Sequence, residues 1–135
     1  MSNIPQDLHY TREHEWARLE DDGRVTVGVT DFAQEQLGDV VFLDLPEGDE
    51  QVEGGEPMGE VESTKSVSDL FSPVTGVVVE INTETKDNPA AVNQDPYGEG
   101  WLVVIEPSDR NEFDGLLTPE EYEAFLEEEA GDGED

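Results

Sequence analysis

The sequence contains no cysteine among its 135 residues. This absence excludes disulfide bonds, a thiol nucleophile and any metal site built on cysteine ligands. The N-terminal segment has no basic region followed by an apolar run, so we expect no secretory signal. No apolar stretch approaches the length that spans a membrane. We therefore expect a soluble protein that works in the cytoplasm and not at a membrane.

Basic residues are also scarce. The chain has 6 lysines and arginines against 36 aspartates and glutamates, and its formal net charge is -30. Such a surface repels nucleic acid, because contacts to phosphates need lysine and arginine, and it repels anionic membrane surfaces. Either this surface binds a basic partner, or the protein is adapted to a salty cytoplasm that screens its self-repulsion. We favour the second interpretation, a halophilic prokaryote, because the acidic residues are spread along the chain.

The length of the chain favours a single domain, which we place at residues 1–129, with a disordered acidic tail at 130–135. Asp31 and Gly38 are placed to cap and close a short helix, and Thr118 to cap a C-terminal one. Residues 86–100 are expected to form a polar loop. We expect a mainly antiparallel β sandwich or flattened barrel with small helices at its edges. Short apolar runs between turn residues predict its strands at 15–19, 24–29, 40–45, 58–62, 67–71, 77–82 and 101–106.

Lysine is the scarcest charged residue, and Lys65 has the most informative surroundings. It lies in V-E-S-T-K-S-V-S-D, between two short strand-like runs, so we place it at a hairpin tip. A primary amine can be acylated, and a group attached at a tip can swing free of the body. These residues leave open whether Lys65 is modified or is an ordinary solvated lysine. Lys86, the other lysine, has no strands around it and is interpreted as an ordinary surface residue.

The remaining candidate sites are weaker. His14-Glu15-Trp16 lacks the second histidine of an H-E-x-x-H zinc site, because Arg18 occupies that position. His9 is a possible second ligand, but no three-ligand spacing is present, so we favour a structural role and no metal. Among 36 acidic residues a pair of carboxylates is expected by chance and does not indicate acid–base catalysis. No motif of a self-sufficient catalytic site is present.

Several segments together resemble one known family. The stretch G-E-V-E-S-T-K-S-V-S-D-L-F-S-P-V-T-G-V-V-V-E-I-N, at 59–82, resembles the lipoyl-attachment hairpin of glycine cleavage system H proteins. Y-T-R-E-H-E-W, V-G-V-T-D-F-A-Q-E-Q-L-G-D-V-V-F-L-D-L-P and N-Q-D-P-Y-G-E-G-W-L are similar to the same family, in the same order. The resemblance covers about 10–126. Biotin carriers usually have methionine on both sides of the lysine, where this chain has Thr64 and Ser66.

The resemblance implies a carrier and not an enzyme. The implied fold is a barrel-sandwich hybrid, as in lipoyl and biotinyl carriers, with short flanking helices and a C-terminal helix. The implied cofactor is lipoate, bound covalently to Lys65 by a lipoylating enzyme. The implied partners are a pyridoxal-phosphate glycine decarboxylase, which loads an aminomethyl group, an aminomethyltransferase, which receives it, and a dihydrolipoamide dehydrogenase, which reoxidises the dithiol. Such carriers are usually monomers.

The resemblance also suggests roles for three carboxylates. Glu62, three residues before Lys65, has the spacing that the lipoylating enzyme is expected to read. Glu15 and Asp69 match acidic positions near the lipoyl arm, and we expect them to line a cleft in which the loaded arm is parked. Two alternatives remain open: a lipoyl relay protein that donates lipoate to other lipoyl domains, and an unmodified acidic module that binds a basic partner.

Overall fold

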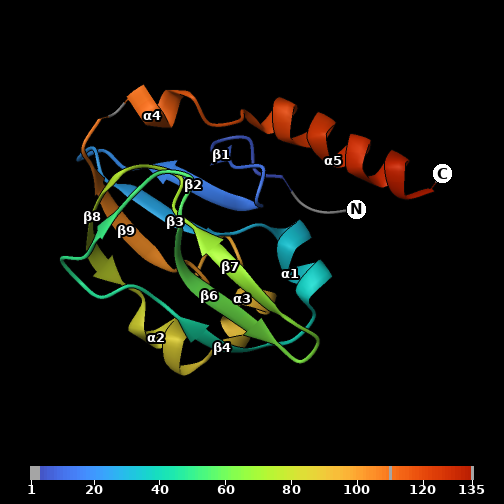
Figure 1. Ribbon diagram of the computed structural model, residues 1–135, viewed down its shortest axis with the longest axis horizontal. Coiled ribbons are helices and arrows are strands. Elements are labelled where there is room, and N and C mark those ends of the chain that lie inside the picture. The colour runs from blue at the N-terminus through green and yellow to red at the C-terminus, as the bar shows by residue number, and fades with distance from the viewer. Residues whose placement is uncertain (1–3, 110, 135) are drawn as a thin grey trace.

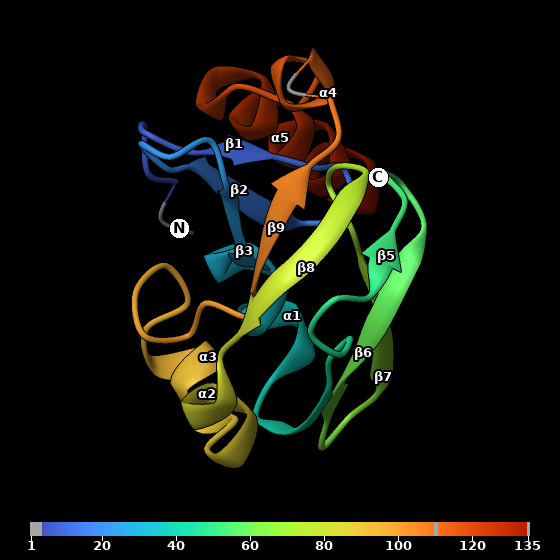
Figure 2. The same cartoon turned by 90° about the vertical axis from the view of Figure 1, so that its left-hand side faces the viewer.

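The computed structural model describes residues 4–109 and 111–134. Within these residues the strands form two antiparallel sheets, one of six strands and one of three. The strands are β1 (His9–Tyr10), β2 (Glu15–Leu19), β3 (Val25–Val29), β4 (Val40–Asp44), β5 (Gln51–Val52), β6 (Pro57–Ser63), β7 (Val67–Phe71), β8 (Gly76–Ile81) and β9 (Val103–Pro107). The larger sheet has the order β1-β2-β3-β9-β8-β5, and the smaller has the order β4-β6-β7. The two sheets lie on opposite sides of the molecule (Figure 2).

Helices flank this sandwich. They are α1 (Asp31–Leu37), α2 (Thr83–Asp87), α3 (Ala90–Gln94), α4 (Asn111–Asp114) and α5 (Pro119–Glu134). The C-terminal α4 and α5 lie at one end, over β1, and α2 and α3 lie at the other (Figure 1). None of the helices in the described residues has the length and apolar composition that crossing a membrane requires. The prediction of a mainly β protein with flanking helices and a C-terminal helix is confirmed.

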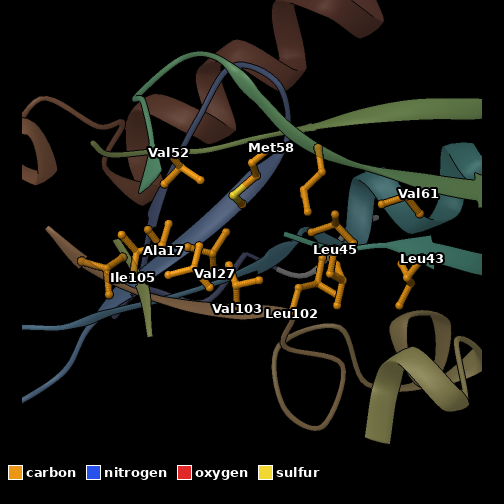
Figure 3. Packing of buried hydrophobic residues seen from close by; sticks show 14 of the residues in the cluster. Ala17, Val27, Leu43, Leu45, Val52, Met58, Val61, Leu102, Val103 and Ile105 are labelled. Atoms are coloured by element: carbon orange, nitrogen blue, oxygen red, sulfur yellow. The ribbon is translucent and has the colours of Figure 1, made fainter. Parts of the chain in front are cut away.

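The main core fills the space between the sheets with aliphatic side chains. Val27, Val103 and Ile105 enter it from the larger sheet, and Leu43 and Val61 enter it from the smaller one (Figure 3). All of them are buried. Each such side chain contributes about 1.5–3 kcal/mol when it leaves water. Apolar and polar residues alternate along β6, and successive side chains of a strand point to opposite faces. One face of β6 therefore lies in the core and the other in solvent.

A second, aromatic cluster attaches α5 to the larger sheet. Tyr10 of β1 stacks on Tyr122 of α5 with ring centroids 4.5 Å apart, and both rings are fully buried. Trp16 of β2 donates its indole N–H to the carbonyl of Pro96 at 2.9 Å. Gly28 lies opposite that indole, where a Cβ atom would come within 2.6 Å of the ring nitrogen. The cluster therefore needs a glycine on β3.

The structure corrects the predicted start of α1 and the loop predicted at 86–100. Thr30, and not Asp31, is the N-cap of α1: its hydroxyl accepts the backbone N–H of Ala33 at 3.1 Å, and Asp31 lies in the first turn. The polar loop expected at 86–100 contains the end of α2 and all of α3. Asn82 caps α2 by accepting the N–H of Thr85 at 3.1 Å, and such five-residue helices carry no periodic apolar pattern that the sequence would reveal.

The C-terminal helix α5 extends past the predicted end of the domain. Its backbone is helical as far as Glu134, and residue 135 lies outside the described residues. The acidic tail at 130–135 remains a prediction. Thr118 begins the helix as expected, since its hydroxyl accepts the N–H of Glu121 at 3.2 Å and the Glu121 carboxylate accepts the N–H of Thr118 at 2.9 Å. Glutamate favours helix, which suits the glutamates at 127–129 of α5. The single-domain boundary at residue 129 remains a prediction.

The acidic surface leads to a first prediction, about salt. Asp44, Glu60 and Asp69 are exposed and directly opposite one another across β4, β6 and β7. Like charges in such positions destabilise a sheet. Screening shortens their repulsion from a range of about 10 Å at 0.1 M salt to about 3 Å at 1 M. We expect the melting temperature, followed by circular dichroism, to fall as salt is withdrawn.

A matched pair of variants locates this effect. Glu60→Gln removes the central charge of the row and should weaken the salt dependence. Asp21→Asn removes an exposed charge in the β2–β3 turn and should change the salt dependence less. Full stability of the unaltered protein in dilute buffer would refute the proposed adaptation to salt.

Candidate functional site

Lys65 lies at the tip of the β6–β7 hairpin, as the sequence predicts. The hydroxyl of Ser63, the last residue of β6, fixes the turn. It accepts the backbone N–H of Lys65 at 3.2 Å and that of Ser66 at 3.1 Å. The Ser63 backbone N–H also donates to the carbonyl of Ser66 at 2.8 Å. The backbone of Lys65 is therefore held firmly, while its side chain is exposed.

A second set of contacts ties this tip to the end of α1. The backbone N–H of Thr64 donates to the carbonyl of Asp39 at 3.1 Å. The aliphatic stem of Lys65 lies over Gly38, where a Cβ atom would come within 2.9 Å of Cε. Gly38 also has a φ of 77°, in the left-handed region that favours glycine. The glycine that ends α1 therefore also leaves room for the lysine side chain.

Asn93 of α3 supports the same corner, and the sequence reasoning did not single it out. Its side-chain oxygen accepts the N–H of Val40 at 2.9 Å. Its side-chain nitrogen donates to the carbonyl of Gly38 at 2.7 Å and to the side-chain oxygen of Gln34 at 3.1 Å. In the sequence, only its position at the start of N-Q-D-P-Y-G marks Asn93 as important. An asparagine in a polar segment is otherwise interpreted as a loop residue.

A cavity of about 220 Å³ begins beside the hairpin tip. It is bounded by α1, by the segment entering β2 and by the edge strand β7. Its wall combines aliphatic and aromatic side chains with carboxylates. The lining residues are Glu13, His14, Glu15, Val29, Phe32, Ala33, Gln36, Leu37, Val61, Ser66, Ser68 and Asp69. We call this cavity the arm cleft. It includes both Glu15 and Asp69, which the family resemblance predicts to lie together, and it includes Ser66, the immediate neighbour of Lys65.

Glu15 is the most unusual group in the arm cleft, because its side chain is only 1% exposed. Its carboxylate accepts the hydroxyl of Thr11 at 2.6 Å and the backbone N–H of Phe71 at 3.1 Å. Burial raises the pKa of this carboxyl to about 7, with a further increase from the charge of Glu13, although both hydrogen bonds oppose the change. Glu15 therefore exchanges a proton near neutral pH.

The other predicted residues have different surroundings. Asp69 is exposed. Its register opposite Glu60 places it on the outer face of the smaller sheet, and at the edge strand β7 it also borders the arm cleft. Glu62 is also exposed, but it lies on the outer face of the smaller sheet, next to Phe42 on β4, and does not line the cleft. Lys86 is exposed on α2 and not on a loop, and it has no hairpin around it.

His14 links the arm cleft to α5. Its backbone adopts a φ of 72°, which is uncommon for any residue other than glycine. Its Nδ1 lies 2.9 Å from the hydroxyl of Tyr122, and its ring packs against Phe32 with centroids 4.7 Å apart. The same Tyr122 hydroxyl is hydrogen-bonded to that of Thr30, the N-cap of α1, at 2.8 Å. One hydroxyl thus connects two walls of the cleft.

These contacts give His14 a structural place. His9, weighed as a second metal ligand, packs its ring against Phe113 with centroids 4.6 Å apart. In the part of the chain that the structure describes, no three His, Asp or Glu side chains are grouped so that they could hold a metal ion. A larger cavity of about 560 Å³ lies beside α2 and is lined by Asn82, Trp101 and several carboxylates. It contains none of the predicted site residues, so its size does not make it the site.

Comparison with known proteins identifies the family. The model of the family described as glycine cleavage H-protein matches residues 8–129. A glycine cleavage system H protein from Rubrobacter xylanophilus is 58% identical over 129 residues, which are 96% of this chain and 99% of the relative. Another, from Halalkalibacterium halodurans, is 50% identical over 96% of this chain and all of the relative.

A solved structure agrees with these relatives. The crystal structure of a glycine cleavage system H protein from Mycobacterium marinum matches with a TM-score of 0.82 and 49% identity, over 88% of this chain and 95% of that one. The chain belongs to the glycine cleavage H-protein family. The predicted barrel-sandwich fold is thereby confirmed. H proteins are the lipoyl carriers of the glycine cleavage system and carry lipoate on a lysine, so this chain is such a carrier.

The residues of this H protein fit a lipoyl group. Lys65 offers an exposed amine on a turn that Ser63 holds in place. The missing side chain at Gly38 leaves space beside the lysine stem. The arm cleft that begins at Ser66 offers apolar walls, which suit a hydrocarbon arm with a sulfur ring, and carboxylates, which suit an amine.

The buried carboxyl leads to a second prediction, about pH. Between its ordinary value of 4.5 and its raised value of about 7, Glu15 keeps a proton in the folded state that it loses in the unfolded state. The stability of the protein therefore falls as pH rises through this window, and the full cost persists above it. Glu15→Gln cannot ionise. We expect the unfolding free energy of this variant, relative to the unaltered protein, to rise by up to about 3 kcal/mol across the window.

Urea unfolding at about pH 5 and about pH 8, at one salt concentration, measures this difference. Asp21→Asn replaces an exposed carboxylate outside the row of Asp44, Glu60 and Asp69 and serves as the control, since its side chain stays in solvent in the folded protein. A relative stability of Glu15→Gln that is the same at both pH values would contradict the raised pKa.

Proposed function

We propose that Lys65 is the residue that carries lipoate in amide linkage, and that the chain shuttles an aminomethyl group between enzymes of the glycine cleavage system. One observation supports this most directly: a firmly held hairpin tip presents an exposed amine beside a cleft that contains a buried carboxyl. Lys86 is also exposed, but it has neither the tip nor the cleft beside it.

The proposed partners follow from this role. They are the lipoylating enzyme, a pyridoxal-phosphate glycine decarboxylase, an aminomethyltransferase and a dihydrolipoamide dehydrogenase. When bound, the lipoyl group supplies a disulfide that accepts the aminomethyl group and a dithiol after its release. The chain has no cysteine of its own for this chemistry, which fits a carrier rather than an enzyme. We place this monomeric carrier in the cytoplasm, together with its partners.

The arm cleft holds the cargo between partners. An aminomethyl group carries an amine that is protonated near neutral pH, and Glu15 and Asp69 are the carboxylates proposed to hold it. A charge-assisted hydrogen bond from an ammonium to a carboxylate is stronger than a neutral one. The amine also favours the ionised form of Glu15, whose pKa of about 7 leaves it able to lose its proton when the cation arrives. Phe32, Leu37 and Val61 exclude water from the same space.

Glu62 has a separate proposed role, in recognition by the lipoylating enzyme. It lies three residues before Lys65 and is exposed on the face of β6 opposite to the buried Val61. Since it does not line the arm cleft, it is free to meet an approaching enzyme.

The third prediction concerns the attachment site. Protein purified from its native host should carry one lipoyl group, on Lys65. Lys65→Arg keeps the positive charge but cannot be acylated, so we expect it to lose all lipoylation and all glycine-decarboxylase exchange activity while its melting temperature is unchanged. Intact mass and peptide mapping provide the measurement. Lys86→Arg is the matched control and should behave as the unaltered protein. A lipoyl group on Lys86, or on neither lysine, would overturn the assignment.

The fourth prediction concerns the arm cleft. Glu15→Gln and Asp69→Asn remove one negative charge each with little change in shape, so both variants should retain the amine cargo for a shorter time. Release of ammonia from loaded protein measures retention. Backbone NMR shifts of Phe32 and Ser68 on loading provide a readout that is independent of activity, and these shifts should shrink in both variants. Glu62→Gln, outside the cleft, is the control. Retention and shifts equal to those of the unaltered protein would remove both residues from the proposed site.

A further inference from the structure

Exposed apolar side chains gather around the hairpin tip. In the part of the chain that the structure describes, four large hydrophobic residues are strongly exposed, and three of them are near Lys65: Val41 at 51%, Phe42 at 53% and Val67 at 56%. The fourth, Leu19, lies at the end of β2 in the other sheet, at 45%. The surface of this chain is otherwise dominated by carboxylates, so a group of exposed apolar residues is not expected from its composition.

The strand register makes this grouping a continuous surface. Phe42 of β4 is directly opposite Glu62 of β6, and Glu62 is directly opposite Val67 of β7. Directly opposed residues share one face of a sheet. Val41 is the additional residue of the β4 bulge next to Phe42. We call Val41, Phe42, Glu62 and Val67 the tip face. Phe42 and Val67 lie on either side of the Glu62 carboxylate, and Val41 lies at the bulge.

The charges beside the tip face indicate what kind of surface it fits. The next row of the same three strands consists of Asp44, Glu60 and Asp69, all exposed. A matching partner therefore presents apolar side chains toward Phe42 and Val67, a basic side chain toward Glu62, and further basic residues toward the row behind it. Buried apolar contacts with a charged rim are the usual composition of a protein interface.

Geometry narrows the choice of partner. An enzyme that acylates Lys65 must bring the lysine amine itself into its active site, and a lysine side chain is short. The residues beside the tip must therefore contact that enzyme. The enzymes of glycine cleavage act at the far end of the lipoyl arm, and so they do not have to approach the tip as closely.

The reaction of the lipoylating enzyme is an acyl transfer. The neutral Nζ of Lys65 attacks the carbonyl of lipoyl adenylate, AMP leaves, and the amide nitrogen loses its extra proton to water.

We propose that the tip face is the docking surface of the lipoylating enzyme, with Phe42 and Val67 as apolar contacts on each side of an ion pair made by Glu62. This proposal rests on the proposed function of Lys65 as the lipoylated residue. It extends recognition from one carboxylate to a surface, and it assigns a role to the apolar residues of β4, which are more than twenty positions away in the sequence.

The test uses the unlipoylated full chain with a purified lipoate–protein ligase, lipoate and ATP. Phe42→Thr and Val67→Thr keep the preference for a strand but remove apolar surface. We expect each to raise the KM for the carrier about tenfold, because an apolar contact at the centre of an interface is lost. The kcat should be nearly unchanged, since the reacting amine is the same. Phe42→Leu should restore most of the affinity, which a variant that merely unfolds would not do.

Leu19→Thr is the matched control, because it removes an equally exposed apolar residue far from the tip, and its KM should equal that of the unaltered protein. A KM for Phe42→Thr and Val67→Thr within twofold of that value, or an equal increase for Leu19→Thr, overturns the proposal. Variants lipoylated to completion are then assayed with glycine decarboxylase. A KM that rises equally in both assays, or only with the decarboxylase, assigns the tip face to another enzyme and also overturns it.

Failure of the underlying function has a different outcome. If Lys65 is not the acceptor, the unaltered protein gains no lipoyl mass on this residue, and both proposals are refuted. If the unaltered protein is lipoylated and the tip-face variants react equally well, only the docking surface is refuted. Concentration-dependent dimers that Phe42→Thr dissolves would show that a second copy of the chain covers this face instead.

Discussion

The fold depends on keeping negative charge out of the core. With a net charge of -30, the chain has little attraction between charges to stabilise it, and the two sheets are held by neutral contacts. Valine, leucine and isoleucine fill the space between them, and the aromatic rings of Tyr10 and Tyr122 attach the last helix. Among the carboxylates of the described residues, Glu15 alone is buried. That exception lies in the arm cleft, where the proposed cationic cargo would offset the cost of burying a carboxyl.

Neutral hydrogen bonds also set the local geometry that ion pairs set in many proteins. The hydroxyl of Ser63 orders the lysine turn, that of Thr30 caps α1, and the amide of Asn93 joins α1 to β4. The hydroxyl of Tyr122 then connects His14 with Thr30, so that α5 and both cleft walls form one network. Such bonds are insensitive to salt, unlike surface ion pairs. Local geometry set by these neutral hydrogen bonds therefore depends less on ionic strength than geometry set by surface ion pairs would.

The sequence predicted those features of the fold that depend on residues close together in the chain. Strand alternation, turn residues and the surroundings of Lys65 were sufficient to place the hairpin and its tip, and the resemblance predicted that Glu15 and Asp69 lie together. Contacts distant in sequence were not predictable in this way. The bond between His14 and Tyr122 joins residues 108 positions apart, and Phe42 meets Glu62 only through the pairing of β4 with β6. The missed helices α2 and α3 are short and held by capping and tertiary contacts, so they lack the periodicity that marks longer helices.

The pairing of β6 with β7 gives the hairpin two different faces. Val61 and Ser68 are opposite each other and line the arm cleft, whereas their neighbours Glu62 and Val67 are opposite each other and lie on the tip face. Successive residues of a strand point to opposite sides of the sheet. If β6 shifted its register by one residue, its two faces would therefore be exchanged. Glu62 would then enter the cleft wall, and Val61 would face water. The Ser63 hydroxyl orders the turn that joins β6 to β7 in this register, so the residue that holds Lys65 also lies where the two faces meet.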